Sequence, residues 1–464
     1  MLDYDLSARG DSALYDYLYQ RIRDDIMAGA IAAGQRLPSK RALAQHLGVS
    51  VVTVEGAYAQ LTAEGYVRSR PRSGYFAYEL PAGEGMPVPT SAPVAACEAV
   101  DDGADLTSSV SFSGDAARLW ARALRQTLSS EPEGEVFAPA SAQGSMRLRR
   151  AIAVHLRQSR GLAVDPTRIV VGAGAQMLDV MISQLVGIGR EFAVEDPGYV
   201  RLTRIYEACG QRVRHVPLDG QGVRVDALGD ADVLHVMPSH QFPTGRVTTI
   251  GRRYELLGWA SARESRWLVE DDYDCEFRMS GRPVPALLSA DVAGNVIYTN
   301  TFSKSLGSAL RLAYMVLPEE LMERYVRELG FYSSTVSSVQ QVTLARILEG
   351  GEYERHVARV RKRCRDMRVA LASVLRSRGD AERVRIEAAD AGLHAVLAIE
   401  GVRDAEVLAE RAVDLGIPGV AFVPLERYVW DAGNAPADGR ARFVVPYDAL
   451  DAAAVARFAD LSLC

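Results

Sequence analysis

The sequence contains very little lysine. Only Lys40, Lys304 and Lys362 are lysines among the 53 lysine and arginine residues. A chain that uses arginine for nearly every cation keeps lysine at few positions, and an amine can do what a guanidinium cannot, because it can lose its proton and form a Schiff base. Lys304, in the run Thr-Phe-Ser-Lys-Ser-Leu over residues 301–306, is therefore a candidate nucleophile. The alternative is that one of three lysines stands in this run by chance.

A positive net charge, paired cysteines and long apolar runs are also lacking. The net charge is −6, so any contact with nucleic acid requires a local basic patch. The five cysteines are scattered without a paired spacing, which argues against a disulfide framework and a zinc site and favours a reducing, cytoplasmic setting. Because no run of ~18 apolar residues occurs and the N-terminus is acidic, we expect neither a membrane span nor a signal peptide.

A segment without helical or strand periodicity separates two regions. Residues 79–109 are rich in proline, glycine, alanine and serine, which is typical of a linker that is partly extended. The full length of 464 residues exceeds the ~100 to 200 residues of one domain. We therefore expect an N-terminal domain over residues 1–78, a linker over 79–109 and a large domain over 110–464.

The N-terminal region has the pattern of a winged helix-turn-helix. Apolar residues recur every four positions and predict a first helix: Leu14, Leu18, Ile22 and Ile26. Ser39 is a good N-cap for a second helix, and Gly48 breaks that helix before a third, the predicted recognition helix, which runs to Gly65. Residues 66–70 and 75–78 predict a two-stranded wing. A plain helical bundle without a DNA role fits the same periodicity.

The basic residues of this region gather at the start of the second helix and in the wing, where a winged helix contacts phosphates. The candidate DNA-binding residues are Ser39, Lys40, Arg41, Thr53, Arg68, Arg70, Arg72 and Ser73. The motifs over residues 37–44, 47–50, 53–54 and 63–67 resemble the GntR-type DNA-binding domain. That family usually has an arginine directly after the Val-Ser pair, where this chain has Val51, so the resemblance implies that Arg41, Thr53 and Arg72 carry more of the binding.

The large region alternates short apolar strands with helical stretches. Predicted strands lie at residues 168–171, 191–194, 233–236, 267–269, 296–298 and 314–317. This alternation is typical of an α/β domain with a mostly parallel sheet, helices on both faces and ligands at the strand ends.

One strand end carries groups that suit pyridoxal phosphate. The ring nitrogen of this cofactor must be held protonated by a carboxylate so that the ring can act as an electron sink. Asp271 follows the strand at 267–269, and Tyr273, on the same side of an extended segment, could reach the ring's phenolic oxygen. Asp272 would then face away. The alternative is an ordinary acidic surface loop over residues 270–276.

A Gly-Ala-Gly-Ala-Gln turn at residues 172–176 could bind the phosphate. It connects a predicted strand with a helix beginning near Met177, so that backbone N–H groups and a helix N-terminus face an anion. Arg311, seven residues after Lys304, adds a cation. A close-packed corner is the alternative for the turn.

The order of these motifs, together with those at residues 195–199 and 238–245, resembles that of fold-type I aminotransferases. Behind a GntR-like domain, it resembles the MocR (GabR-like) family of transcriptional regulators over nearly the whole chain apart from the linker. The resemblance implies a smaller C-terminal subdomain, bound pyridoxal 5′-phosphate and a homodimer, arranged head to tail.

The resemblance also implies roles for individual residues. Lys304 matches the Schiff-base lysine, Asp271 the partner of the ring nitrogen, Tyr273 the partner of the phenolic oxygen and Tyr199 the aromatic stacked on the ring. The phosphate-binding positions are Ala175, Gln176, Thr301, Ser303 and Arg311.

Two arginines match positions that bind the carboxylate of a substrate or effector. Arg442 matches the arginine that grips a carboxylate by a bidentate fork. Arg201 resembles a second such arginine, with a surface position beside Arg204 as the alternative. Three departures imply a looser grip on the cofactor: Ala175 replaces a hydroxyl residue, Phe137 a tyrosine of the partner subunit, and Phe242 an asparagine.

These patterns predict a cytoplasmic, dimeric transcription factor that binds a double-stranded operator and senses an amino compound through the large domain. A dimer is expected because paired half-sites require two DNA-binding units. A working aminotransferase with a DNA-binding appendage, and a regulator that senses pyridoxal phosphate itself, are the alternatives. Lys362, in a basic run over 359–365, predicts a solvated helix face or a contact along DNA.

Overall fold

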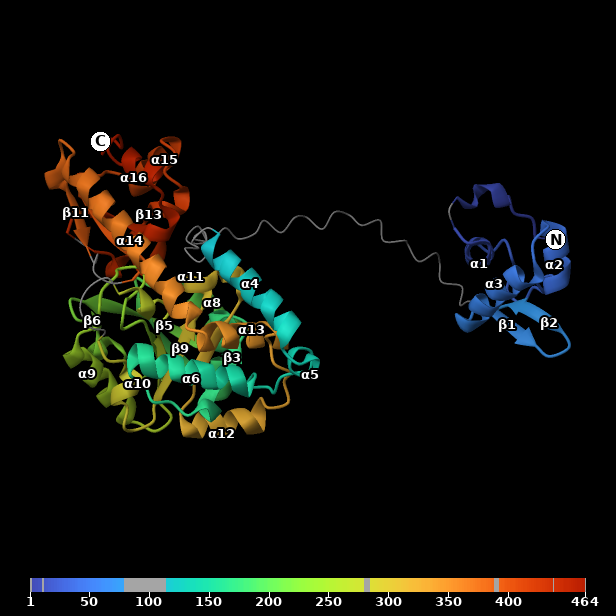
Figure 1. Ribbon diagram of the computed structural model, residues 1–464, viewed down its shortest axis with the longest axis horizontal. Coiled ribbons are helices and arrows are strands. Elements are labelled where there is room, and N and C mark those ends of the chain that lie inside the picture. Colours follow the sequence, from blue (N-terminus) through green and yellow to red (C-terminus); the bar gives the residue numbers. More distant parts are fainter. Residues whose placement is uncertain are drawn as a thin grey trace. The chain divides into compact units, whose positions relative to one another are not determined.

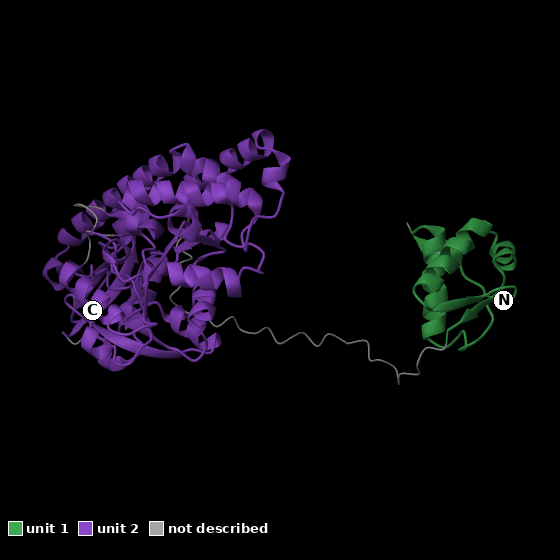
Figure 2. Cartoon of the chain, turned by 90° about the horizontal axis from the view of Figure 1, so that it is seen from below, with its two compact units in different colours: residues 1–101 green, residues 102–464 purple. Residues whose placement is uncertain are grey.

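The computed structural model describes residues 2–10, 12–78, 114–278, 284–387, 392–436 and 438–463. The chain divides into two compact units, residues 1–101 and 102–464, drawn in green and purple in Figure 2. The predicted linker at 79–109 lies outside the described residues. No helix within the described ranges is both long enough and apolar enough to cross a membrane.

The N-terminal unit is a winged helix-turn-helix, as predicted. Its elements are η1 (Leu6–Arg9), α1 (Leu14–Met27), α2 (Lys40–Leu47), α3 (Val51–Ala63), β1 (Val67–Arg70) and β2 (Gly74–Ala77). Ser39 caps α2 by accepting the N–H of Ala42, and Gly48 ends α2 with a left-handed φ of 67°. The wing is antiparallel, and the apolar faces of the three helices enclose one core.

The large unit is built on a sheet whose strand order, within the described residues, is β3-β10-β9-β8-β7-β4-β5-β6. The strands are β3 (Ile169–Gly172), β4 (Glu191–Asp196), β5 (Arg212–Asp219), β6 (Gly222–Val223), β7 (Val233–Val236), β8 (Trp267–Asp271), β9 (Val296–Thr301) and β10 (Ala313–Val316). Strands β5, β4, β7, β8 and β9 run parallel, whereas β10 is antiparallel to both of its neighbours. The predicted mostly parallel sheet is therefore confirmed.

Helices cover both faces of this sheet (Figure 1). They are α4 (Asp115–Ser130), α5 (Glu133–Val136), α6 (Met146–Arg160), α7 (Ala175–Val186), α8 (Val200–Ala208), α9 (Ile250–Ser261), α10 (Leu287–Ala290), α11 (Ser303–Leu306), α12 (Glu319–Glu328), α13 (Ser338–Glu349) and α14 (Glu352–Arg376). One apolar core lies between the sheet and helices α4, α6, α13 and α14, and another between the sheet and helices α7, α8 and α12. Lys362 is exposed on α14.

The chain ends in the smaller C-terminal subdomain that the family resemblance implied. Its antiparallel sheet has the order β11-β12-β14-β13 and packs against α14, α15 and α16. The elements are β11 (Val384–Glu387), β12 (His394–Glu400), α15 (Ala405–Asp414), β13 (Val423–Pro424), β14 (Arg440–Pro446) and α16 (Ala452–Arg457). Asp196, at the end of β4, joins this subdomain to the large sheet by accepting the N–H groups of Trp430 and Asp431 at 2.9 Å each.

A buried histidine on α6 lies between two carboxylates, and we expect it to make the stability of the large unit depend on pH. His155 Nδ1 lies 3.2 Å from Glu354 Oε1, and Nε2 lies 3.8 Å from Glu276 Oε1. Burial opposes the charged imidazole, but the two carboxylates outweigh it and raise the pKa of His155 from 6.5 to about 9. Because the folded-state pKa is the higher one, this stabilisation is complete below pH 6.5 and is lost as the pH rises through 9.

We expect the free energy of unfolding of the large unit to fall by roughly 2–3 kcal/mol between pH 6.5 and pH 9.5 from this group alone. The measurement is urea unfolding at both pH values for the wild type and His155→Gln. The variant should lose most of this pH dependence. If the free energy of unfolding changes equally between the two pH values in both proteins, His155 is not the source of the pH dependence.

Candidate functional site

The residues predicted to hold a cofactor converge on one pocket of the large unit. The space in this pocket, counted together with the solvent at its open mouth, is about 840 Å³. All nine predicted residues line it: Lys304, Asp271, Tyr273, Tyr199, Ala175, Gln176, Thr301, Ser303 and Arg311. Eight of them lie at or just beyond the carboxyl ends of parallel strands β8 and β9 and at the starts of α7, α8 and α11, where open α/β sheets bind ligands. Arg311 lies two residues before β10.

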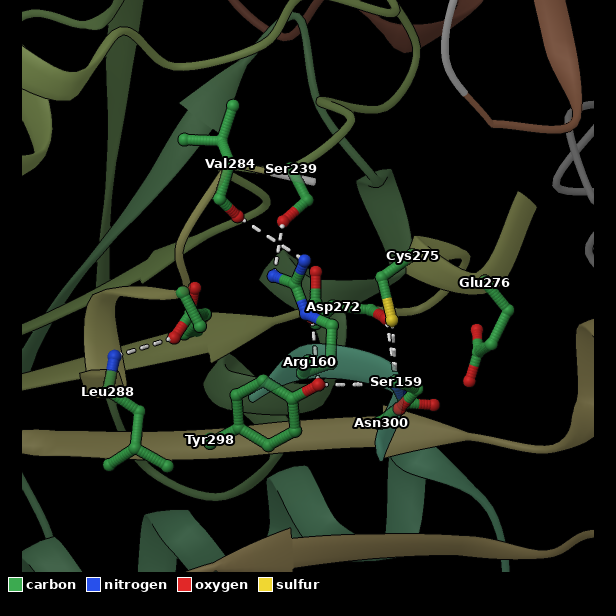
Figure 3. A network of polar contacts seen from close by, with 12 residues as sticks. Ser159, Arg160, Ser239, Asp272, Cys275, Glu276, Val284, Leu288, Tyr298 and Asn300 are labelled. Atoms are coloured by element: carbon green, nitrogen blue, oxygen red, sulfur yellow. Dashed lines mark hydrogen bonds and ion pairs between the residues drawn. The ribbon is translucent and has the colours of Figure 1, made fainter. Parts of the chain in front are cut away.

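Asp271 and Tyr273 reach the pocket because the residue between them points away. Asp272 is buried, its Oδ2 lies 2.8 Å from Arg160 Nε, and Tyr298 donates its hydroxyl to the same oxygen at 2.8 Å (Figure 3). Asp272 does not line the pocket, as expected from the alternation of side chains in an extended segment. The two flanking side chains are thereby directed to the opposite side.

Arg160, the last residue of α6, binds the end of β8 on the side that faces away from the pocket. Its guanidinium also donates to Ser239 Oγ at 3.1 Å and to the carbonyl of Val284 at 3.3 Å (Figure 3). Burial opposes the charge, but nearby anionic groups, Asp272 first, raise the pKa of Arg160 above its usual range. The network is a buried charge pair with further hydrogen bonds, so removing one partner leaves the other charge uncompensated.

A second buried group stands behind Asp271. His235 on β7 lies with Nε2 3.7 Å from Asp271 Oδ2, and its Nδ1 is 2.6 Å from the hydroxyl of Tyr206. Burial opposes a charge on His235, but Asp271 and Asp179 raise its pKa. Burial raises the pKa of Asp179, which also lines the pocket, to about 7. Sequence reasoning missed His235 because it stands in a run that otherwise has the pattern of an apolar strand.

Tyr273 also has polar neighbours on the side of the C-terminal subdomain. Its hydroxyl is 3.2 Å from His240 Nδ1, which lies 2.7 Å from Asp274 Oδ2. The ring of His394, on β12, packs against that of His240 with the ring centres 4.4 Å apart and the planes tilted by 43°. Ligand atoms of His240, Asp274 and His394 lie within 4.8 Å of one another. No sequence pattern pointed to this cluster, because its members are 34 and 120 residues apart (274 − 240 and 394 − 274).

The phosphate turn differs from the prediction in one detail. Helix α7 begins at Ala175, two residues before the predicted start near Met177, because Gly174 adopts a φ of 88° and directs the chain into the helix. Ala175 and Gln176 are thus in the first turn, where backbone N–H groups have no acceptor within the helix. Arg311 donates to Gln176 Oε1 at 3.5 Å, so a cation lies beside these N–H groups.

The predicted DNA-binding residues lie on α2, α3 and the wing of the N-terminal unit. Arg41, Arg68, Arg70 and Arg72 are exposed, as is Ser73 between the wing strands. Lys40 differs, because its amine forms an ion pair with Glu55 of α3 at 2.5 Å and lies over the ring of Tyr75. Ser39 and Thr53 take part in helix caps.

Comparisons with known proteins assign both units. Residues 14–76 match the family described as bacterial regulatory proteins, gntR family, and residues 87–414 match aminotransferase class I and II. The chain is 36% identical over 414 residues to the uncharacterized HTH-type transcriptional regulator YdeL of Bacillus subtilis, covering 88% of each chain. It is 31% identical over 446 residues to the probable rhizopine catabolism regulatory protein MocR of Rhizobium meliloti, covering 91% of this chain and 88% of that protein.

The chain belongs to the MocR-type transcriptional regulators. A third relative, the pyridoxine biosynthesis transcriptional regulator PdxR of Corynebacterium glutamicum, is 33% identical over 410 residues, covering 86% of each chain.

Solved structures show the aminotransferase fold of the large unit. An archaeal alanine:glyoxylate aminotransferase superposes with a TM-score of 0.64 at 20% identity, covering 74% of this chain and 86% of that one. The α-aminoadipate aminotransferase LysN of Thermus thermophilus, complexed with N-(5′-phosphopyridoxyl)-L-leucine, has a TM-score of 0.60 at 25% identity, covering 74% and 88%.

Two predicted carboxylate-binding arginines of this MocR-type regulator stand apart from the pocket lining. Within the described residues, that lining includes neither Arg442 nor Arg201. Arg442, on β14, is held by Glu387 at 3.0 Å and Asp438 at 2.7 Å. A ligand carboxylate would have to exchange with one of these two side chains. Arg201 lies half-buried near the start of α8.

Proposed function

We propose that this MocR-type regulator holds pyridoxal 5′-phosphate at Lys304 and binds operator DNA according to the amino compound that enters the same pocket. The observation that carries the proposal is the convergence of a lysine, a carboxylate, two tyrosines and a helix N-terminus with an arginine on one cavity. The named relatives are described as regulators, which supports the regulatory half of the proposal.

The donor set of the pocket fits this cofactor. When bound, pyridoxal phosphate supplies an aldehyde for an amine and a ring that acts as an electron sink. Lys304 would provide the amine, Asp271 would keep the ring nitrogen protonated, and Tyr273 would donate to the phenolic oxygen. Tyr199 offers its aromatic face. His235 would hold Asp271 in place directly, and Arg160 would fix the same strand end through its ion pair with Asp272.

The phosphate would lie against the first turn of α7. The N–H groups of Ala175 and Gln176 and the guanidinium of Arg311 would bind it, with the hydroxyls of Thr301 and Ser303 on the other side. Thr301 donates its hydroxyl to Ser303 Oγ at 2.9 Å, which leaves the hydroxyl proton of Ser303 for the anion.

Gly174→Ala tests this placement. A Cβ at Gly174 would lie 2.4 Å from Arg311 Nη2, and the residue has a φ of +88°, so alanine must displace the guanidinium. We expect the affinity for pyridoxal phosphate to fall by about tenfold or more, which corresponds to loss of one charge-assisted contact. The measurement is a titration of the cofactor followed by absorbance.

Gly189→Ala is the matched control for this substitution. Gly189 has a similar φ of +77°, but a Cβ there meets nothing within 4 Å. This variant carries the backbone strain without the clash and should bind the cofactor like the wild type. Equal affinities in both variants would place the phosphate elsewhere.

The effector would be an amine that replaces Lys304 as the cofactor's partner. Such a ligand can change DNA binding only if it has different affinities for two states of the protein, and the resulting coupling is reciprocal. If the effector carries a carboxylate, Arg442 would bind it after exchanging Asp438 or Glu387, and Arg201 would be the second candidate.

The regulator would act as a homodimer, arranged head to tail. Phe137 is 68% exposed. By the family resemblance it stands where aminotransferases have the tyrosine that one subunit contributes to the pocket of the other, which supports a subunit contact through this residue. Two DNA-binding units would then contact paired half-sites of a double-stranded operator.

The deciding experiment measures operator affinity and keto-acid formation in the same solution. We expect operator affinity to change when an amino compound is added, without sustained formation of keto acid. Steady turnover would instead identify a working aminotransferase. The named relative PdxR gives a reason to include pyridoxal phosphate as a possible signal, which would change operator affinity without any added amine.

A further inference from the structure

We propose that the first turn of α3 recognises thymine methyl groups in the major groove through Val51 and Val52. This inference rests on the proposed operator binding and specifies which feature of the bases is recognised. In a helix-turn-helix, the N-terminal residues of the second helix contact base edges in the major groove. That helix is α3, which follows α2 after the three-residue turn at 48–50.

Two apolar side chains stand at the start of α3, on its outer face. Val52 is 75% exposed and Val51 is 42% exposed, whereas Val54, two positions after Val52, is fully buried in the core of the unit. The inward face of α3 is accounted for by Val54 and by Ala57, Tyr58 and Leu61. The two exposed valines are therefore not needed for the core. Neither favours the helix, since β-branched residues have lower helix propensity than alanine.

The same helix offers no cation to the bases. From Val51 to Ala63 its sequence is VVTVEGAYAQLTA, which contains neither lysine nor arginine. Its single charged residue, Glu55, is paired with Lys40 at 2.5 Å. The bidentate contact of arginine or lysine to guanine, the commonest specific contact in the major groove, cannot come from α3.

The hydroxyls at the start of α3 are also engaged within the protein. Ser50 Oγ accepts the N–H of Thr53 at 3.1 Å and lies 2.7 Å from Thr53 Oγ1. Apolar side chains in the major groove have one specific complement among the bases, the C5 methyl group of thymine. Val51 and Val52 are therefore the base-contacting groups that this first turn presents, and they match thymine.

Affinity and base preference would then come from different parts of the unit. The exposed Arg68, Arg70 and Arg72 of the wing would bind phosphates, which adds affinity and salt dependence without sequence information. Substitution in the wing should weaken binding to all duplexes alike. Substitution of the valines should change which duplex is preferred.

The test begins with the full-length, cofactor-loaded protein and a random duplex library. After selection of the preferred site, each thymine in it is replaced singly by deoxyuridine, which lacks only the methyl group. We expect at least one replacement to lower affinity by about three- to fivefold, as expected for one buried methyl group. In Val51→Ala or Val52→Ala the same replacement should change affinity by less than about 1.5-fold, because the methyl group has lost its contact.

Met27→Ala is the control variant. Met27 is an apolar side chain at the end of α1 that is 63% exposed, so its replacement removes exposed apolar surface from a different helix. This variant should show the wild-type difference in affinity between the duplex with thymine and the duplex with deoxyuridine. Because Val51 and Val52 lie outside the core, their alanine variants should melt at the wild-type temperature, which separates lost recognition from lost folding.

The outcomes are distinct. If the wild type binds a selected site but is indifferent to every deoxyuridine replacement, or if both valine variants keep the full effect, the inference is wrong and operator binding stands. If the protein selects no duplex from the library, the proposed DNA-binding function is wrong, and this inference is wrong with it.

Discussion

Replacing Arg160 by leucine is expected to destabilise the large unit by about 3–5 kcal/mol, the cost of breaking a buried ion pair from one side. Asp272 would keep its charge in a buried position without its ion-pair partner, although the hydroxyl of Tyr298 would still donate to it. The contacts to Ser239 and Val284 would be lost as well. Thermal unfolding of the cofactor-free protein measures the effect, with an expected decrease of several degrees.

Two further variants separate the charge from the packing. Arg150→Leu lies on the same helix but at an exposed position, so it should leave the melting temperature nearly unchanged. Adding Asp272→Asn to Arg160→Leu removes the buried carboxylate that has lost its partner, and should recover part of the stability. If Arg160→Leu melts within about one degree of the wild type, the buried pair does not stabilise the strand end.

Asp271→Asn is expected to weaken binding of pyridoxal phosphate by about 10- to 100-fold, because it replaces a charge-assisted hydrogen bond to the ring nitrogen by a neutral one. Asparagine has nearly the same shape, so the pocket should remain intact. The loss should appear in a cofactor titration, while the melting temperature of the cofactor-free variant stays close to that of the wild type.

Asp226→Asn provides the comparison for this charge change. Asp226 forms an exposed ion pair with Arg224 and does not line the pocket. Its variant should bind the cofactor with wild-type affinity. If Asp271→Asn also binds the cofactor with wild-type affinity, Asp271 does not contact the cofactor.

Local patterns were sufficient to predict the elements. The alternation of apolar strands with helical stretches gave the parallel strands within a few residues, because strands buried on both faces must be apolar along their whole length. Ser39 and Gly48 marked the ends of α2 for reasons contained in the adjacent backbone, a capping hydroxyl and a left-handed φ. The start of α7 was misplaced by two residues, because Gly174 could not be distinguished from its neighbour Gly172 by type alone.

Contacts between distant segments could not be predicted in this way. His235 and His240 have no local pattern, since the partners that give them a place at the site come from other strands and from the C-terminal subdomain. The pairing of Lys40 with Glu55 required the angle between α2 and α3. Likewise, the ion pair of Arg442 with Glu387 depends on the registers that β11 and β14 each form with β12, the strand between them.

The most direct measurement of the central claim is the visible absorbance spectrum of the purified protein mixed with pyridoxal phosphate, recorded for the wild type, Lys304→Ala and Lys304→Arg and titrated with amino compounds. The wild type should give a band that differs from that of the free cofactor, and an effector amine should change it. Neither variant should form this band without added amine, since the alanine side chain has no amine and the guanidinium of arginine stays protonated. A wild-type spectrum identical to that of the free cofactor, or an unchanged band in Lys304→Arg, would contradict the assignment of Lys304.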